Sequence, residues 1–216
     1  MKINNKLVSI TITALLYAGL SSTAIAAGTK ITPSIESVTV EHNGNEVAVS
    51  RNQDPNGVAD VTWTKTGRRC PPFCVQPLTA APGVETVGIA EVVNFMRNEL
   101  AVDDGVIIDA RTPDWFTRGT IPGSVNIPFT SLHRSKGADD GSIMEAFERF
   151  GVTRSGDGSW DFSEAKNLIL WCNGWWCGQS PMAIKGLLNE GYPADRLFYY
   201  RGGMQNWQIY GLTVVK

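Results

Sequence analysis

Three short apolar runs in the second half of the chain are each followed by a loop rich in polar residues or glycine. They are GVIIDA at residues 105–110, NLILWC at 167–172 and RLFYY at 196–200. Helical patterns, with apolar residues three or four positions apart, occur at 85–100, 142–151 and 180–191. Strands that alternate with helices predict an α/β fold, in which helices cover both faces of a mostly parallel sheet.

The helix at 180–191 carries the clearest boundary signals. We expect Ser180 to be its N-cap, Pro181 to lie in the first turn and Gly191 to end it. The helix therefore starts just after the loop that runs from Cys172 to Cys177.

Residues 1–26 have the pattern of a secretory signal peptide. Lys2 and Lys6 precede an apolar run, and Ala24-Ile25-Ala26 is the small-x-small pattern that signal peptidase cleaves. The run is shorter than the roughly 20 residues of a spanning helix. We predict cleavage after Ala26, export to a bacterial periplasm, and no membrane anchor after cleavage.

The predicted mature chain consists of an N-terminal extension, residues 27–83, and a main domain, residues 84–216. Within the extension, apolar and polar residues alternate on both sides of Asn43-Gly44-Asn45, which predicts a β-hairpin. Residues 54–83 are rich in proline, include CPPFC at 70–74, and predict a long irregular connection. The extension is too short to form a hydrophobic core unaided.

Composition bounds the functions that the chain can have. Hydrophobic residues make up 43% and charged residues 19% of the 216 positions, which argues against a disordered chain or a coiled coil. The formal net charge is −2, and loss of the signal removes two lysines and no acids. We therefore expect no nucleic-acid partner and no anionic membrane surface.

Polar residues follow all three predicted strands at the same end. The segments are Asp109-Ala110-Arg111, Cys172 to Cys177, and Arg201-Gly202-Gly203. In parallel sheets, ligands bind beyond the carboxyl ends of the strands. We therefore predict one site formed by these three segments.

Cys172 closes its strand and precedes a glycine-containing loop and a helix. A thiol becomes a good nucleophile when backbone N–H groups or a helix N-terminus lower its pKa from about 8.5. Such surroundings favour a thiolate or a persulfide without a histidine, and the chain contains only His42 and His133. The alternative is that Cys172 is a buried packing residue.

Three segments together resemble the rhodanese (sulfurtransferase) family. Residues 105–129, GVIIDARTPDWFTRGTIPGSVNIPF, are similar to its strand, Asp-x-Arg turn and G-x-I-P-G-x-x-N-I-P loop. LILWCNGWWC at 168–177 is similar to its active-site strand and six-residue loop, and YRGGMQNWQIYGLTV at 200–214 to its closing G-G-x-x-x-W segment. The resemblance spans about residues 84–216 and leaves the hairpin and CPPFC outside.

The resemblance implies a single-domain rhodanese fold with a five-stranded parallel sheet and a persulfide mechanism. Cys172 would take a sulfane sulfur from a small donor, hold it as Cys–S–SH, and yield it to cyanide or a thiol acceptor, with no cofactor and no metal. Substrate-binding residues would be Asn173, Gly174, Trp175, Trp176, Cys177 and Arg111, while Asp109, Gly202 and Gly203 would be structural at the site.

The chain departs from the family pattern at positions that concern the substrate. Thr120 replaces the histidine of the usual Gly-His-Ile-Pro. The cysteine loop contains no arginine or lysine, so we expect it to bind the thiosulfate dianion less well, and the physiological donor stays open. We expect one of Trp175 and Trp176 to line an apolar mouth that favours organic thiols or a partner protein, and the other to lie in the core.

The four cysteines allow three full pairings, among which the sequence does not choose. Cys177 is either a resolving thiol for Cys172 or a packing residue at the helix start. Cys70 and Cys74 pair with each other only if the chain turns sharply, because an extended polyproline run separates their Cα atoms by ~12 Å. Otherwise they would dock near the active site and pair with its cysteines. A zinc or copper site of all four is less favoured, since the spacings are unusual for zinc.

An exported sulfurtransferase is therefore the favoured hypothesis. The second is a periplasmic thiol–disulfide redox or persulfide-carrier protein that uses Cys172 and Cys177 with a partner protein. The third is a non-catalytic binding module on a rhodanese scaffold, because a fold alone does not establish an activity.

Overall fold

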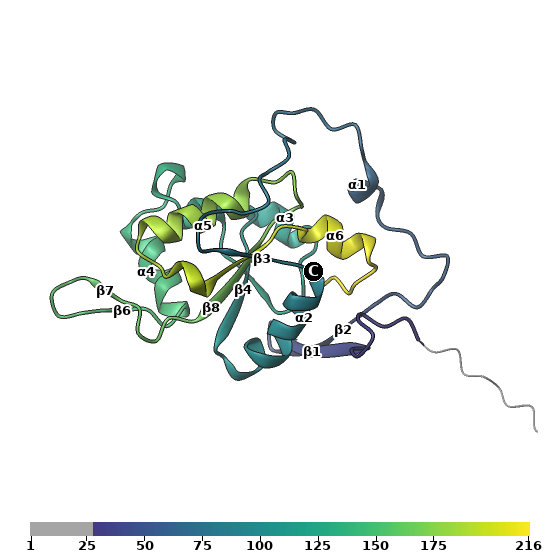
Figure 1. Cartoon of the computed structure of the whole chain (residues 1–216), viewed down its shortest axis with the longest axis horizontal. Coiled ribbons are helices and arrows are strands. Elements are labelled where there is room, and N and C mark those ends of the chain that lie inside the picture. Colours follow the sequence, from purple (N-terminus) through teal and green to yellow (C-terminus); the bar gives the residue numbers. More distant parts are fainter. Residues whose placement is uncertain (1–27) are drawn as a thin grey trace, which may run out of the picture.

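The structure is a computed structural model that describes residues 28–216. The predicted signal peptide and its cleavage site after Ala26 lie outside the described residues. Figure 1 shows the sheet at the centre, with helices on both sides and the extension running along the outside. Within residues 28–216, no helix has the length and apolar character needed to cross a membrane.

The strands and helices have the following bounds. The strands are β1 (Ser37–His42), β2 (Asn45–Ser50), β3 (Glu85–Val87), β4 (Gly105–Asp109), β5 (Ser124–Asn126), β6 (Thr153–Arg154), β7 (Trp160–Asp161), β8 (Asn167–Trp171) and β9 (Leu197–Tyr200). The α-helices are α1 (Val61–Thr64), α2 (Ile89–Asn98), α3 (Pro113–Arg118), α4 (Asp140–Arg149), α5 (Gln179–Asn189) and α6 (Gly203–Ile209). Short 3₁₀ helices are η1 (Leu100–Val102), η2 (Phe129–Ser131), η3 (Arg134–Lys136) and η4 (Ala194–Arg196).

Five strands form one parallel sheet in the order β3-β9-β8-β4-β5. The predicted α/β fold with a five-stranded parallel sheet is confirmed, and the three strands expected from apolar runs are β4, β8 and β9. One expectation was wrong in detail: Glu85–Val87 lies in the run that we assigned to a helix, but it forms edge strand β3. Three residues are too few to show a periodicity of their own beside the long helical pattern that begins at Ile89.

Side chains of the central strand β8 alternate between two hydrophobic clusters. Leu168 and Leu170 belong to the cluster that includes buried residues of α4 and α5. Ile169 and Trp171 belong to the cluster that includes α2 and α6. Because both faces are covered, the strand is apolar from Leu168 to Trp171, and Cys172 follows it directly.

The hairpin predicted in the extension is present, with β1 and β2 antiparallel around Asn43 and Gly44. Both turn residues have positive φ, of 52° and 77°, as this tight turn requires. Val40 and Val49 are buried in the same cluster as α2. Figure 1 shows the hairpin beside α2. The extension therefore completes the core of the main domain, while the boundary at residues 83 and 84 stays a prediction from sequence.

The shared core generates a prediction for Val49, which is fully buried. Val49→Ala should lower the free energy of unfolding by about 2 kcal/mol, because it removes two methyl groups and leaves a cavity. Denaturant titration under non-reducing conditions measures the change. Val58→Ala is the matched control, since Val58 is 92% exposed and should change little. Equally small effects of both would show that the extension is not part of the core.

Candidate functional site

Cys172 follows β8 directly, and its side chain is 2% exposed. The Ser180 hydroxyl donates a hydrogen bond to Cys172 Sγ at 3.1 Å. The backbone N–H groups of Gly174 and Ser180 also lower the pKa of this thiol. When Cys172 is protonated, its thiol donates to the backbone carbonyl of Cys177 at 3.3 Å. The loop and the first turn of α5 thus surround the sulfur with donors.

The donors outweigh burial in setting the pKa of Cys172. Burial raises the pKa of the Cys172 thiol because it removes water from the charged form. Hydrogen bonds from Cys177, from the Ser180 hydroxyl and from the N–H groups of Ser180 and Gly174 lower it by more, so the pKa falls to about 7. Burial raises the pKa of Cys177 well above its usual value, and the adjacent Cys172 raises it further. The two thiols are therefore inequivalent: Cys172 ionises and Cys177 stays protonated.

Ser180 is not the N-cap of α5, which corrects our expectation. The helix begins at Gln179 with Gly178 at the N-cap position, and Ser180 is fully buried in the first turn. Its hydroxyl therefore bonds to sulfur instead of to a backbone N–H group. Pro181 lies in the first turn as expected. Gly191, at φ 92°, follows the end of the helix by two residues.

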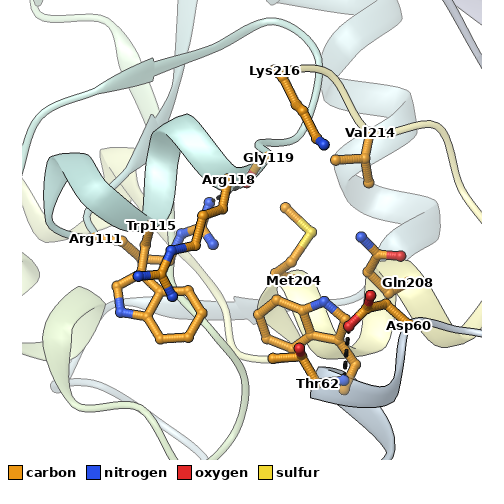
Figure 2. Close-up of a pocket in the computed structure, with 11 residues that line it drawn as sticks. Asp60, Thr62, Arg111, Trp115, Arg118, Gly119, Met204, Gln208, Val214 and Lys216 are labelled. Atoms are coloured by element: carbon orange, nitrogen blue, oxygen red, sulfur yellow. Dashed lines mark hydrogen bonds between the residues drawn. The ribbon is translucent and has the colours of Figure 1, made fainter.

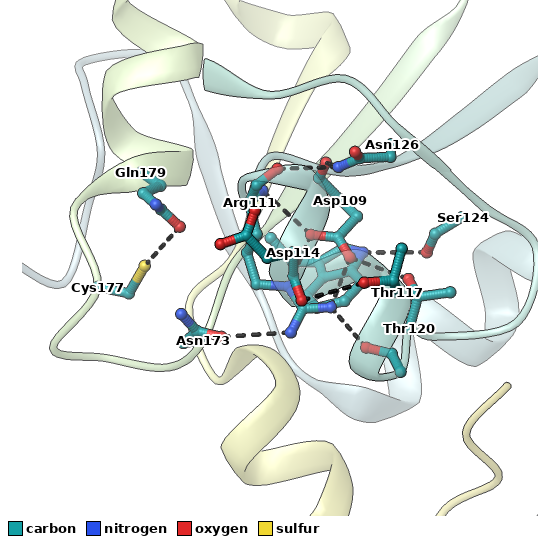
Figure 3. Close-up of polar contacts among 12 residues, drawn as sticks. Asp109, Arg111, Asp114, Thr117, Thr120, Ser124, Asn126, Asn173, Cys177 and Gln179 are labelled. Carbon is teal, nitrogen blue, oxygen red and sulfur yellow. Dashed lines mark hydrogen bonds and ion pairs between the residues drawn. The ribbon is translucent and has the colours of Figure 1, made fainter. Parts of the chain in front are cut away.

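Asp109 and Arg111 form a buried ion pair at the end of β4 (Figure 3). Arg111 Nε and Nη2 contact the two carboxylate oxygens at 2.8 and 2.6 Å. Nη2 also donates to the Gly119 carbonyl, and Nη1 donates to Asn173 Oδ1 at 3.3 Å. Thr120, at the position of the family's histidine, donates to Asp109 Oδ2 at 3.0 Å. This network joins β4, the loop before β5 and the cysteine loop.

The start of α6 supports the cysteine loop from the other side. The N–H groups of Met204 and Gln205 donate to the carbonyls of Cys172 and Asn173, at 2.9 and 3.0 Å. Gly203 has φ 53°, and a Cβ atom there would lie 2.1 Å from the Cys172 carbonyl oxygen. A side chain at this position would push α6 off the loop, which explains the glycine. Gly202, one residue earlier, is the N-cap of α6.

Cys70 and Cys74 form a disulfide with each other, with Cα atoms 4.7 Å apart, while Cys172 and Cys177 are free and buried. The run is a turn and not extended polyproline, and the Phe73 N–H donates to the Arg69 carbonyl at 3.2 Å. The alternative pairing with the active-site cysteines is therefore wrong for this state. A metal site of all four cysteines is also excluded here, because two of them are bonded to each other.

The disulfide turn nevertheless docks on the cysteine loop. The Gln76 N–H donates to the Trp175 carbonyl at 2.8 Å. Arg201 donates to the carbonyls of Gln76 and Pro77, at 2.8 and 3.0 Å. The extension therefore continues from the hairpin to the mouth of the site, where it contacts both the loop after β8 and the residue after β9.

The two tryptophans of the loop differ in their surroundings. Trp175 is 38% exposed. Trp176 is half-buried, with the Phe73 ring 4.9 Å from its own ring and the Arg68 guanidinium 4.7 Å from its ring centroid. Its indole N–H donates to Gln205 at 2.8 Å. One tryptophan is thus open to solvent, while the other packs both under the extension and against the core cluster of α2 and α6.

The buried Tyr199 hydroxyl has no hydrogen-bond partner among residues 28–216. Burial raises the pKa of Tyr199, and negative charge on Cys172 raises it further. The hydroxyl therefore stays protonated and lies close enough to sense the charge of the thiolate. It is a spare donor beside the site, and sequence reasoning did not find it.

A cavity of about 350 Å³ lies beside α3 and α6 (Figure 2). Trp63 and Trp115 line it, with their ring centroids 6.0 Å apart. Arg118 and Lys216 also line it. No cysteine lines it. It touches the site only through Met204 and the Arg111 network.

The fold and the site together define an α/β domain in which a buried cysteine closes the central strand of a parallel sheet and faces donors from the following loop and helix. Residues 90–210, more than half of the chain, match the family described as Rhodanese-like domain. The chain therefore belongs to the rhodanese-like family, and the resemblance found in its sequence is confirmed.

Solved structures with a similar fold are distant in sequence. A protein of unknown function and possible tyrosine phosphatase from Rhodopseudomonas palustris is 20% identical, with 63% of this chain and 88% of that chain covered and a TM-score of 0.42. The human single-domain sulfurtransferase is 18% identical, with 57% of this chain and 95% of that chain covered and a TM-score of 0.38. Thiosulfate sulfurtransferase from Pseudomonas aeruginosa is 21% identical, with 64% of this chain but only 21% of that chain covered and a TM-score of 0.42. No curated protein matches the chain.

The donors around Cys172 predict the pH dependence of its ionisation. The thiolate fraction should rise as the pH increases through about 7, as followed by the ultraviolet absorbance of the thiolate. Cys172→Ser should abolish this transition. Ser180→Ala should move it to higher pH, because the thiolate loses a donor. Ser37→Ala, at an exposed position of β1, should leave it unchanged. A midpoint that Ser180→Ala does not move would contradict the assignment.

The buried ion pair predicts a large effect of Asp109→Asn on stability. The substitution leaves the Arg111 charge buried without its partner and should lower the free energy of unfolding by about 3 kcal/mol, measured by denaturant titration. Asp103→Asn is the control, because it breaks the ion pair between Lys166 and Asp103, whose side chain is 90% exposed. It should change the free energy of unfolding little. Comparable losses in both variants would disprove the special role of the buried pair.

Proposed function

We propose that this protein is a sulfurtransferase that carries a sulfane sulfur on Cys172. Membership of the rhodanese-like family supports a sulfurtransferase-type function at the level of the family. The observation that carries the finer proposal is the set of donors around Cys172 Sγ, with a pKa of about 7. A thiol that is half-ionised near neutral pH supplies a competent nucleophile without a histidine base.

The chemistry proceeds in two redox-neutral displacements. The Cys172 thiolate attacks the outer sulfur of a donor such as thiosulfate, so that a Cys172–S–S⁻ bond forms, the donor S–S bond breaks and sulfite leaves. An acceptor then attacks the outer sulfur of the persulfide and restores the Cys172 thiolate. With cyanide the product is thiocyanate. The donors of Gly174 and Ser180, which stabilise the thiolate, also lie beside the persulfide anion, and Tyr199 offers a further donor.

Cys177 gives the site a second chemical outcome. As a thiolate it attacks the inner sulfur of Cys172–S–SH, which forms a Cys172–Cys177 disulfide and releases hydrosulfide. The proximity of the two thiols, each of which shifts the pKa of the other, supports this role. The raised pKa of Cys177 makes the attack slow, so the persulfide persists. The thiol–disulfide redox function is therefore the second candidate, and Cys177 acts as a switch in either case.

The proposed partners are a small sulfur donor and a thiol acceptor, and the proposed compartment is the periplasm. The signal-like residues 1–26 support export. The Cys70–Cys74 disulfide supports it independently, because disulfides persist in oxidising compartments. A periplasmic thiol or redox protein is a further proposed partner, with Trp175 at the exposed mouth as a contact.

Cyanolysis with thiosulfate and with an organic persulfide as donors tests the proposal. Cys172→Ser should reduce thiocyanate formation to background with every donor, because the sulfur carrier is lost. Cys177→Ser should keep turnover, since only the switch is lost. Met144→Ala, at an exposed position of α4 away from the site, is the control and should keep full turnover.

The other outcomes separate the remaining hypotheses. Equal loss in Cys172→Ser and Cys177→Ser, with a Cys172–Cys177 disulfide found by mass spectrometry after mild oxidation, would favour the obligatory redox pair. Absence of turnover with every donor in the unmodified protein would disprove the sulfurtransferase and leave the non-catalytic binding module.

A further inference from the structure

A cavity of about 450 Å³ opens at the start of α5, beside the cysteine loop. Its floor is formed by the first turn of the helix, including Gln179, Pro181 and Met182. Its opposite wall is formed by Pro72 and Gln76 of the disulfide turn. The volume lies in the range of small-ligand sites, and the walls are mainly apolar.

One residue of the cavity floor contacts the Cys177 thiol, and the next residue along the chain contacts Cys172. Gln179 lines the cavity, and its Oε1 accepts a hydrogen bond from Cys177 Sγ at 3.6 Å. Figure 3 shows this side chain pointing at Cys177. Ser180, the next residue, donates to Cys172 Sγ. Both cysteines are buried here, so an acceptor in the cavity would need the Gln179 side chain to move aside.

The wall opposite the helix comes from outside the family domain. Gln76 is held by its N–H bond to the Trp175 carbonyl and by Arg201. The Cys70–Cys74 disulfide closes the turn that carries Pro72. The matched family region starts at residue 90, so the domain alone would leave this side of the cavity open.

The charge of the cavity is positive in a chain that is acidic as a whole. Lys136 of η3 and Lys185 of α5 line it, and within residues 28–216 no acidic side chain does. Neither lysine forms an ion pair in the described part of the chain, where the five pairs found involve other residues. The cysteine loop has no cation of its own, so these lysines provide the positive charge on the α5 side of the mouth.

We propose that this cavity binds the acceptor of the sulfur, and that the acceptor is an organic thiol with a carboxylate and a short apolar body. The carboxylate lies between Lys136 and Lys185, and the apolar part packs on Pro72, Pro181 and Met182. The thiolate RS⁻ attacks the outer sulfur of Cys172–S–SH, which forms R–S–SH and releases the Cys172 thiolate. This inference rests on the proposed sulfurtransferase function and adds the class of acceptor to it.

Single-turnover transfer to three thiols of different charge tests the inference. The full-length protein is loaded with sulfur from inorganic polysulfide, desalted, and mixed with 3-mercaptopropionate, 2-mercaptoethanol or cysteamine, which are anionic, neutral and cationic. Mass spectrometry follows the loss of the Cys172 persulfide. Each thiol is compared between unmodified protein and variant, so its intrinsic reactivity cancels.

The Lys136→Gln, Lys185→Gln double variant should slow transfer to 3-mercaptopropionate roughly fivefold, because two charge contacts are lost. Transfer to 2-mercaptoethanol should change less than about twofold, and transfer to cysteamine should not slow. Lys30→Gln, at an exposed position of the extension, is the charge control and should alter none of the three rates.

Two results would overturn the inference: an unchanged rate with 3-mercaptopropionate, or equal slowing with all three thiols, which would indicate damage to the loop. Cyanide separates this failure from failure of the proposed function. If cyanide removes the sulfur from the loaded protein as thiocyanate, only the cavity assignment is lost. If neither cyanide nor any thiol removes it, the sulfurtransferase function is lost as well.

Discussion

The buried Asp109–Arg111 pair is the interaction on which the geometry of the site depends. Arg111 uses four of its five N–H donors, toward Asp109, Gly119 and Asn173, and its guanidinium lies 4.6 Å from the Trp171 ring centroid. A charge buried this deeply is tolerated only when its partners are fixed. The pair thus holds the ends of two neighbouring strands and the first residue after Cys172 in one arrangement, so the donors to sulfur need no reorganisation when the thiolate forms.

The sequence predicts those elements whose pattern is contained in a continuous stretch of residues, and it does not predict contacts between distant parts of the chain. β4, β8 and β9 were predictable because each is a continuous apolar run, and α5 because its periodicity is strong. β3 and β5 were not found from the residue pattern, because three residues carry no period. The same limit applies to Ser180 and Tyr199, whose roles depend on contacts across the fold. Thr120 did carry a signal, since it occupies a family motif position, but its bond to Asp109 required the structure.

The extension shows how residues outside a family pattern become part of a site. The hairpin is anchored by Val40 and Val49 in the core, which fixes where the following chain can run. The disulfide turn then meets the loop through Trp176 and the Trp175 carbonyl. Both contacts are made to residues inside the loop, leaving Cys172 untouched. If the proposed function holds, selectivity for the acceptor can therefore change through the extension without disturbing the donors that stabilise the thiolate.

Burial of Cys172 has opposite effects on the two stages of the proposed mechanism, formation of the thiolate and survival of the persulfide. Removal of water raises the pKa of the thiol, and only the converging donors bring it down to about 7. In the proposed mechanism, the same removal of water would protect the sulfane sulfur from small nucleophiles in solution. A sulfur carrier needs both properties, whereas a packing cysteine needs neither a lowered pKa nor a ring of donors. The donors are thus the feature that distinguishes Cys172 from Cys177, which is equally buried but keeps its proton.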